Sequence, residues 1–96
     1  MAVIRWSLRA VGDLESICDY IAKDSEHYAR VFAQKVMEIV ESLADLPLSG
    51  RVVPEYNTKE LRERIFQNYR IVYRVSSSGM IEIVSICHGA KPIPRM

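Results

Sequence analysis

The first half of the chain carries two apolar patterns of helical period. One set recurs at spacings of four, three and four residues: Ala10, Leu14, Ile17 and Ile21. A second set continues the period further on: Ala29, Phe32, Val36, Ile39 and Leu43. Ser7 and Ser25 precede the two stripes and can cap the helices through their hydroxyls. Because the link between them is short, the pattern predicts an antiparallel helical hairpin over residues 7–46, ended by Pro47 and Gly50.

The second half alternates with a period of two, which is typical of strands. Residues 61–66, 69–75 and 80–87 are expected to be strands, with turns at Gln67-Asn68 and at residues 76–79. The short segment 3–6 reads as an opening strand. The order β-α-α-β-β-β predicts one α+β domain over residues 1–96, with the hairpin packed on a three- or four-stranded antiparallel sheet whose strands lie within residues 61–88.

Composition restricts the class of protein. Ninety-six residues suffice for one domain with a modest core, and no apolar run approaches the length of a membrane span. With no signal-peptide pattern, we expect a cytoplasmic protein that does not bind membranes. Cys18 and Cys87 lack a partner motif and are expected to be buried, reduced thiols. The two histidines are far apart in the sequence, so we expect no metal and no cofactor.

Charge is distributed unevenly. Residues 7–46 hold four basic and eight acidic side chains, and residues 51–96 hold eight basic and four acidic ones. Alternation places Tyr69, Ile71, Tyr73 and Val75 on one face of their strand, and Arg70, Val72 and Arg74 on the other. We therefore expect an exposed basic face with Arg70 and Arg74, to which adjacent strands bring Arg62 or Arg64 and His88.

Such a face is suited to binding an anionic partner or to cleaving a phosphodiester. Cleavage of RNA needs a general base, a general acid and cations for the phosphorane. His88 could transfer protons, Arg62, Arg70 and Arg74 could bind phosphate, and Glu55 or Glu63 could act as the base. The alternative is structural: His88 bonds to backbone, the glutamates pair with neighbouring arginines, and Arg51 forms a salt bridge that fixes its loop.

Several segments resemble the ParE/RelE superfamily of toxins from bacterial toxin–antitoxin modules, over roughly residues 4–94. They are Trp6-Ser7-Leu8-Arg9-Ala10, Leu43-Ala44-Asp45-Leu46-Pro47-Leu48-Ser49-Gly50-Arg51, Leu61-Arg62-Glu63, Tyr69-Arg70-Ile71-Val72-Tyr73-Arg74 and Ile86-Cys87-His88-Gly89. The resemblance implies the fold expected above and two possible activities. RelE-like members are ribosome-dependent mRNA endonucleases, and ParE-like members are associated with inhibition of DNA gyrase.

The C-terminal segment resembles the ParE branch more closely. Nuclease branches often place a tyrosine directly after the histidine or in the tail, whereas Gly89 follows His88 here and no tyrosine follows Tyr73. The resemblance therefore favours a gyrase-binding toxin. An mRNA endonuclease using Arg62, Arg70, His88 and Glu63 is the alternative, and a member without toxicity is a third possibility.

The resemblance also implies a protein partner. A small cognate antitoxin with an acidic, apolar C-terminal segment is expected to fold onto the toxin and form a hetero-oligomer with it. The basic residues are the expected contacts for partners: Arg51, Arg62, Arg70, Arg74 and His88.

Overall fold

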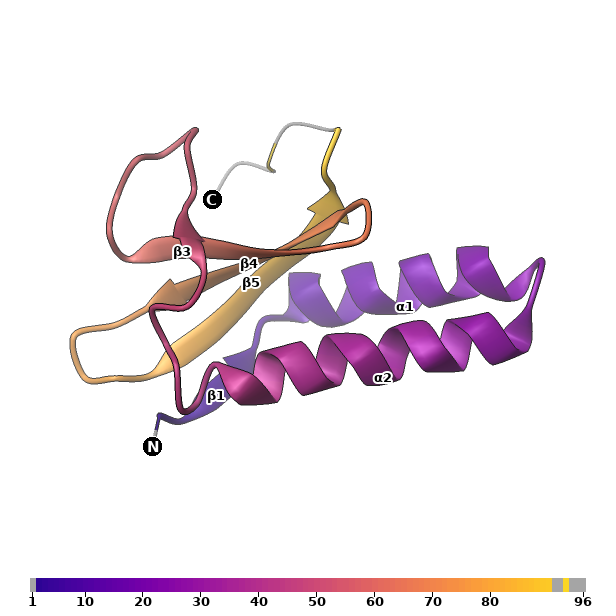
Figure 1. Ribbon diagram of the computed structural model, residues 1–96, viewed down its shortest axis with the longest axis horizontal. Coiled ribbons are helices and arrows are strands. Elements are labelled where there is room, and N and C mark those ends of the chain that lie inside the picture. The colour runs from indigo at the N-terminus through magenta and orange to yellow at the C-terminus, as the bar shows by residue number, and fades with distance from the viewer. Residues whose placement is uncertain (1, 91–92, 94–96) are drawn as a thin grey trace.

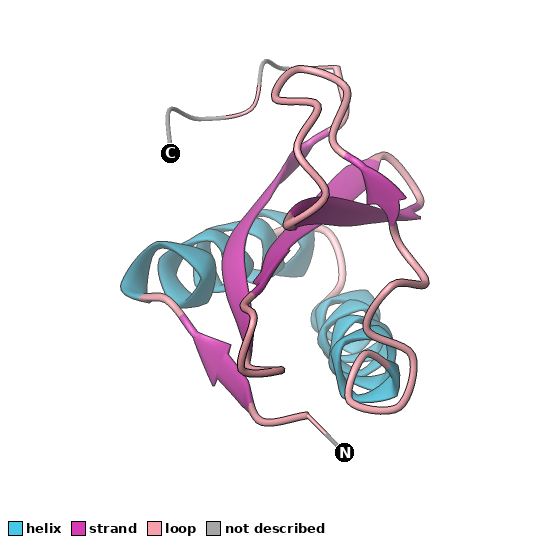
Figure 2. Cartoon of the chain, turned by 90° about the vertical axis from the view of Figure 1, so that its left-hand side faces the viewer, coloured by secondary structure: helices cyan, strands magenta, loops and turns pink. Residues whose placement is uncertain are grey.

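The computed structural model describes residues 2–90 and residue 93. Its elements follow one another as β1 (Ile4–Trp6), α1 (Leu8–Ala22), α2 (Glu26–Ser42), β2 (Arg51–Val52), β3 (Leu61–Phe66), β4 (Tyr69–Val75) and β5 (Ile81–His88). The two helices run antiparallel on one side of a twisted sheet (Figure 1). Figure 2 looks nearly along α2 and shows α1 inclined to it. The α+β fold with a helical hairpin is confirmed.

Both predicted caps are present. The Ser7 hydroxyl accepts the Ala10 N–H at 3.0 Å, and the Ser25 hydroxyl accepts the Tyr28 N–H at 3.1 Å. Each serine thus satisfies an N–H that has no partner within its helix. The buried face of α2 follows the predicted stripe, with Phe32, Val36 and the following Leu43 in the core.

The sheet differs from the prediction in two strands. Its order is β1-β5-β4-β3-β2, and β1 pairs with β5 in parallel, so the five-stranded sheet is mixed. The cause is the path of the hairpin, which returns the chain to the end of the sheet where β1 began; the Ala2 N–H bonds to the Ala44 carbonyl at 3.1 Å. The chain therefore enters β3 in the same direction as β1, and two further reversals give β5 that direction too. The second difference is the two-residue strand β2, which the alternation of residues did not indicate.

The sheet buries apolar residues on both faces. The helix side holds the main core, including Ile71 and Tyr73 of β4 and Ile83 of β5. A second, smaller cluster lies on the opposite side, which we call the outer face. It consists of Val53, Leu61, Val72 and Ile93, with Val84 and Cys87 against it. The loop after β2 and residue 93 thus contribute to a cover over the face that we expected to be solvated.

Candidate functional site

An ionic cluster of four residues occupies the outer face. The Nε of Arg70 donates to Oε1 of Glu63 at 2.5 Å, and its two terminal nitrogens donate to the carboxylate of Glu55 at 2.7 and 2.8 Å. The Nε of Arg51 donates to the second oxygen of Glu63, also at 2.5 Å. Two guanidinium groups therefore face two carboxylates. We call these residues, Arg51, Glu55, Glu63 and Arg70, the ionic cluster.

The expectation that Arg70 is exposed is wrong. Arg70 retains 6% of its accessible surface and Glu63 only 1%. Alternation gave the correct face for Arg70, but the sequence pattern did not show that the loop after β2 folds back over it. The alternative assignment for Arg51 is confirmed, because its salt bridge to Glu63 fixes β2 to β3.

Both glutamates that were considered as general bases are paired with Arg70. The hydrogen bonds from Arg70 lower the pKa of Glu55 to about 2. The pKa of Arg70 is raised, chiefly by its hydrogen bonds to Glu55. A carboxylate with such a low pKa is a weak acceptor of protons near neutral pH. The structural reading, in which the glutamates pair with arginines, is confirmed for Glu55 and Glu63.

Arg62 and Arg64 do not lie on the outer face with Arg70. Arg62 lies opposite Tyr73 in the β3–β4 ladder and therefore points to the helix side. Its guanidinium donates to the carbonyls of Lys59 and Gly50 at 2.9 and 3.1 Å. Arg64 shares that side and donates to the Ser49 hydroxyl at 3.2 Å. Arg74 is exposed on the outer face. The expectation that Arg62 or Arg64 lies on one surface with Arg70 and Arg74 is therefore wrong.

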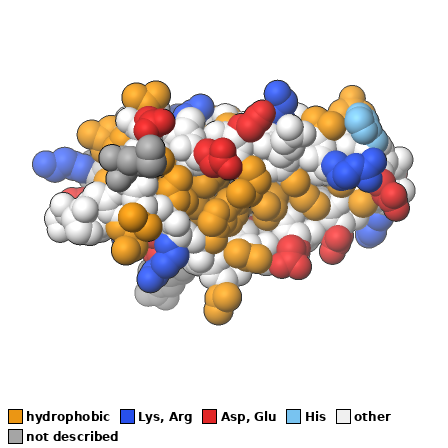
Figure 3. All heavy atoms as spheres, turned by 90° about the horizontal axis from the view of Figure 1, so that it is seen from below, with side chains coloured by type: hydrophobic (Ala, Val, Ile, Leu, Met, Phe, Trp, Pro, Cys, Tyr) orange, Lys and Arg blue, Asp and Glu red, His pale blue; other side chains and the backbone are white. Residues whose placement is uncertain are grey.

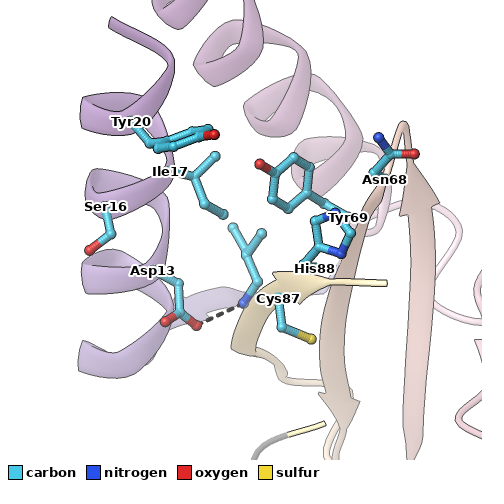
Figure 4. A pocket seen from close by; sticks show the side chains of 9 residues that line it. Asp13, Ser16, Ile17, Tyr20, Asn68, Tyr69, Cys87 and His88 are labelled. Atoms are coloured by element: carbon cyan, nitrogen blue, oxygen red, sulfur yellow. Dashed lines mark hydrogen bonds between the residues drawn. The ribbon is translucent and has the colours of Figure 1, made fainter. Parts of the chain in front are cut away.

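His88 ends β5 on the helix side, opposite Tyr69, and their ring centroids are 5.6 Å apart. Its Nδ1 accepts the Ala90 N–H at 3.1 Å, which confirms the expectation of a strand-end histidine bonded to backbone. The proton of the neutral imidazole then lies on Nε2. The ring borders an open cleft of about 700 Å³ between α1 and the ends of β4 and β5 (Figure 4).

Apolar and polar side chains line the cleft together. They are Ile17, Ile86, Tyr20, Tyr69, Asp13, Ser16, Asn68, Cys87 and His88. Figure 4 shows the thiol of Cys87 directed away from the helices, consistent with its place in the outer cluster. Cys18 and Cys87 are free and only half-buried, and burial raises the pKa of both thiols. Full burial of the cysteines was therefore a wrong expectation.

Asp13 is an important polar residue that the sequence reasoning missed. Its Oδ2 accepts both the Ser85 hydroxyl at 2.8 Å and the Ile86 N–H at 2.9 Å. Those residues follow an irregularity of β5, where Val72 pairs with Ser85 but Tyr73 pairs with Ile83. A signal was present, because Asp13 lies three residues after Ala10 and four before Ile17, on the apolar face of α1. Asp13 therefore ties α1 to β5.

Tyr73 holds the loop that follows α2. Its ring is fully buried, and its hydroxyl accepts the Gly50 N–H at 2.9 Å and donates to the Pro47 carbonyl at 2.8 Å. A Cβ on Gly50 would lie 2.5 Å from the Glu63 carbonyl oxygen, so the close approach requires glycine here. Tyr73 therefore fixes the loop after α2 to the sheet from within the core.

The proposed RNase residues do not converge. His88 faces the helix side, whereas Glu63 and Arg70 are paired on the outer face, and Arg62 is bonded to the loop carbonyls. Residues 2–90 and 93 contain no cluster of three metal-ligating side chains. In the same described part of the chain, neither helix is long and apolar enough to cross a membrane.

The element order and the five-stranded sheet define a small α+β domain with a helical hairpin on one side. A family model described as the ParE toxin of the type II toxin–antitoxin system parDE matches residues 4–93. The chain belongs to this family. It is also similar to a ParDE toxin–antitoxin structure from P. aeruginosa, with a TM-score of 0.74 and 23% identity, covering 92% of this chain and 96% of the other.

Two curated relatives match along nearly their whole length. Toxin RelE2 of Caulobacter vibrioides is 33% identical over 91 residues, which cover 95% of this chain and 99% of the relative. The Y4kP protein of Sinorhizobium fredii is 34% identical over 95 residues, covering 97% and 94%. These matches agree with the family assignment.

Proposed function

We propose that this protein is a growth-inhibiting toxin that acts in the cytoplasm by binding DNA gyrase and that a cognate antitoxin neutralises it. The observation that supports action by binding, and not by catalysis, is the separation of the candidate catalytic groups. Glu63 and Arg70 neutralise each other on the outer face, while His88 lies on the helix side beside Tyr69. General acid–base catalysis needs its proton donors and acceptors within hydrogen-bond reach of one substrate.

An antitoxin partner is supported by the family and by the surface of the helical hairpin. Figure 3 views the molecule from the helix side and shows hydrophobic side chains along the middle of this face, with charged side chains around them. Five large apolar residues of the helices keep more than a third of their surface exposed: Leu8, Val11, Tyr20, Tyr28 and Met37. An apolar band with a charged rim is typical of an interaction surface.

A ribosome-dependent mRNA endonuclease is the alternative function. One relative at 33% identity carries the name Toxin RelE2. In addition, Nε2 of His88 has no hydrogen-bond partner among the described residues, so it is available to a ligand at the cleft. In this alternative His88 would be the proton-transfer group, and its replacement would abolish cleavage.

Two assays run side by side separate these functions. Purified toxin is titrated into a supercoiling reaction with gyrase and relaxed plasmid, and into translating ribosomes whose message is then mapped for breaks. Toxin saturated with antitoxin is the control in both, and His88→Ala is tested beside the wild type. We expect loss of supercoiling with intact message. Cleaved message with unaffected supercoiling would contradict the proposal and favour the endonuclease.

A further inference from the structure

The loop after α2 exposes two leucines that are separated by one residue. Leu46 and Leu48 each keep 61% of their accessible surface, on either side of Pro47. A single exposed leucine is ordinary on a protein surface. Here, however, hollows of about 370 and 260 Å³ adjoin Leu48, the first formed by the loop itself and the second shared with Lys59, Arg62 and Val75.

Hydrogen bonds hold this loop in place. The buried Tyr73 hydroxyl bonds to Pro47 and Gly50 from below, and the Ser49 N–H bonds to the Leu46 carbonyl at 3.0 Å. From the side, Arg62 donates to the Gly50 carbonyl and Arg64 to the Ser49 hydroxyl. The two leucines are therefore presented to solvent by a fixed backbone, and a partner that covers them would not have to order the loop first.

Cations surround the leucines without carboxylate partners. Among the described residues, no carboxylate oxygen lies within 4.0 Å of a side-chain nitrogen of Lys59, Arg62 or Arg64, in contrast to Arg51 and Arg70. Among the residues that line the two hollows, Lys59 and Arg62 are balanced by Asp45 and Glu60. Arg64, which is bonded to the neighbouring Ser49, adds one cation in excess. The surface thus combines apolar anchors with a local positive field, which complements an apolar segment that carries acidic residues.

We infer that Leu46, Leu48, Lys59, Arg62 and Arg64, the 46–48 surface, bind an acidic, apolar segment of the cognate antitoxin. The inference rests on the proposed function in assuming such a partner. Apolar side chains of the segment cover the two leucines and enter the adjoining hollows. Its carboxylates meet Lys59 and Arg64, whose charges have no carboxylate partner among the described residues. The leucines supply the affinity, and the cations supply the attraction at long range.

The test uses the full-length toxin and the purified product of the neighbouring antitoxin gene. In Leu46→Ser/Leu48→Ser, we expect the affinity for antitoxin to fall at least ~30-fold, since covering a leucine is worth a factor of ten or more. Ile65→Ser is the matched control, because Ile65 is 53% exposed on β3 and lies opposite Arg70, on the outer face of the sheet. Lys59→Gln/Arg64→Gln should weaken binding at low salt and flatten its salt dependence. Unchanged urea unfolding verifies that each variant is folded.

Other outcomes overturn the inference. Unchanged antitoxin affinity in the double leucine variant would do so directly. Loss of growth inhibition with full antitoxin affinity would assign the surface to the cellular target. Loss of a wild-type dimer in sedimentation would assign it to a second copy of the toxin. If instead the wild-type toxin neither binds the antitoxin nor arrests growth, the proposed function itself has failed.

Discussion

Glu63 is the most completely buried charged side chain among the described residues, and it bonds to two arginines at once. Its position in β3 connects β2, through Arg51, with β4, through Arg70. Breaking a buried ion pair leaves an uncompensated charge in a poorly solvated place, which costs more than the loss of an exposed pair. Glu63 is therefore the residue whose replacement should affect this part of the molecule most.

Glu63→Gln should lower the free energy of unfolding by about 3 kcal/mol, because Arg51 and the buried Nε of Arg70 lose their charged acceptor. Urea unfolding monitored by circular dichroism measures the change. Glu82→Gln is the control, since its pair with Arg5 is solvent-exposed and should contribute less than about 1 kcal/mol. Equal effects of the two substitutions would show that the ionic cluster is no more stabilising than a surface pair.

The lowered pKa of Glu55 predicts a dependence of stability on pH. Its pKa lies near 2 in the folded protein, below its ordinary value of 4.5, so the stabilisation is fully present above about pH 4.5. It is lost as the pH falls from there towards 2, because protonation of Glu55 removes its charged bonds to Arg70. The free energy of unfolding, measured between pH 6 and pH 2, should depend less steeply on pH in Glu55→Gln than in the wild type. The exposed Glu60→Gln should retain the wild-type slope, and identical slopes in both variants would refute the assignment.

Single residues also mark the limit of the sequence reasoning. Alternation placed Arg70 on the correct face of β4 and Tyr73 in the core. It could not give the solvent exposure of Arg70, because that depends on residues 53–55, which fold over β4 from a loop without periodicity. The structural role expected for Arg51 was right because the acidic Glu63 lies within reach across an adjacent strand.

At the scale of elements, the carboxylate of Asp13 couples the helical hairpin to the sheet. One oxygen accepts two hydrogen bonds at the irregular part of β5, so it satisfies the fully buried Ser85 and a backbone N–H together. α1 rests on β5 at this point, beside the cleft that ends at His88. The position of α1 and the shape of the cleft therefore depend on the same side chain.

Asp13→Ala should reduce the free energy of unfolding by about 1–3 kcal/mol, because two donors lose their acceptor. Hydrogen exchange should accelerate at the Ile86 amide before it changes elsewhere in β5. Asp19→Ala, an exposed aspartate of the same helix, is the matched control. An unaltered Ile86 exchange rate in Asp13→Ala would mean that the bond does not couple the two elements.

The helices could be predicted more fully than the sheet. Caps and apolar period are local signals, and both Ser7 and Ser25 act as expected. The order and direction of strands depend on how the whole hairpin returns the chain, which is why the parallel pairing of β1 was not predicted. The two hairpin turns were predicted because their signals are also local, and the positive φ angles of Gln67 and Gly79 lie in them.

At the scale of the whole molecule, the candidate binding surfaces lie on different sides of a small scaffold. The helix side carries an apolar band (Figure 3), and Leu46 and Leu48 lie in the loop after α2. Arg74 is exposed on the outer face. Arg70, expected as a partner contact, is occupied by its own carboxylates, so its replacement would test folding rather than recognition. Arg74 remains the predicted antitoxin contact of that strand.

Arg74→Ala should weaken antitoxin binding ~2–5-fold at low salt and have no effect at high salt, as expected for one exposed charge pair. Its stability should match that of the wild type, because the described residues form no ion pair with Arg74. Titrations at two salt concentrations measure this. The same loss of affinity at both concentrations would argue against an electrostatic contact.

The most direct test of a binding toxin is equilibrium titration of the purified protein into purified gyrase, without ribosomes or message. We predict saturable binding with a defined stoichiometry, accompanied by loss of supercoiling over the same concentration range. Toxin already saturated with antitoxin should neither bind nor inhibit. Absence of binding to gyrase by toxin that arrests growth and cleaves ribosome-bound message would contradict the account.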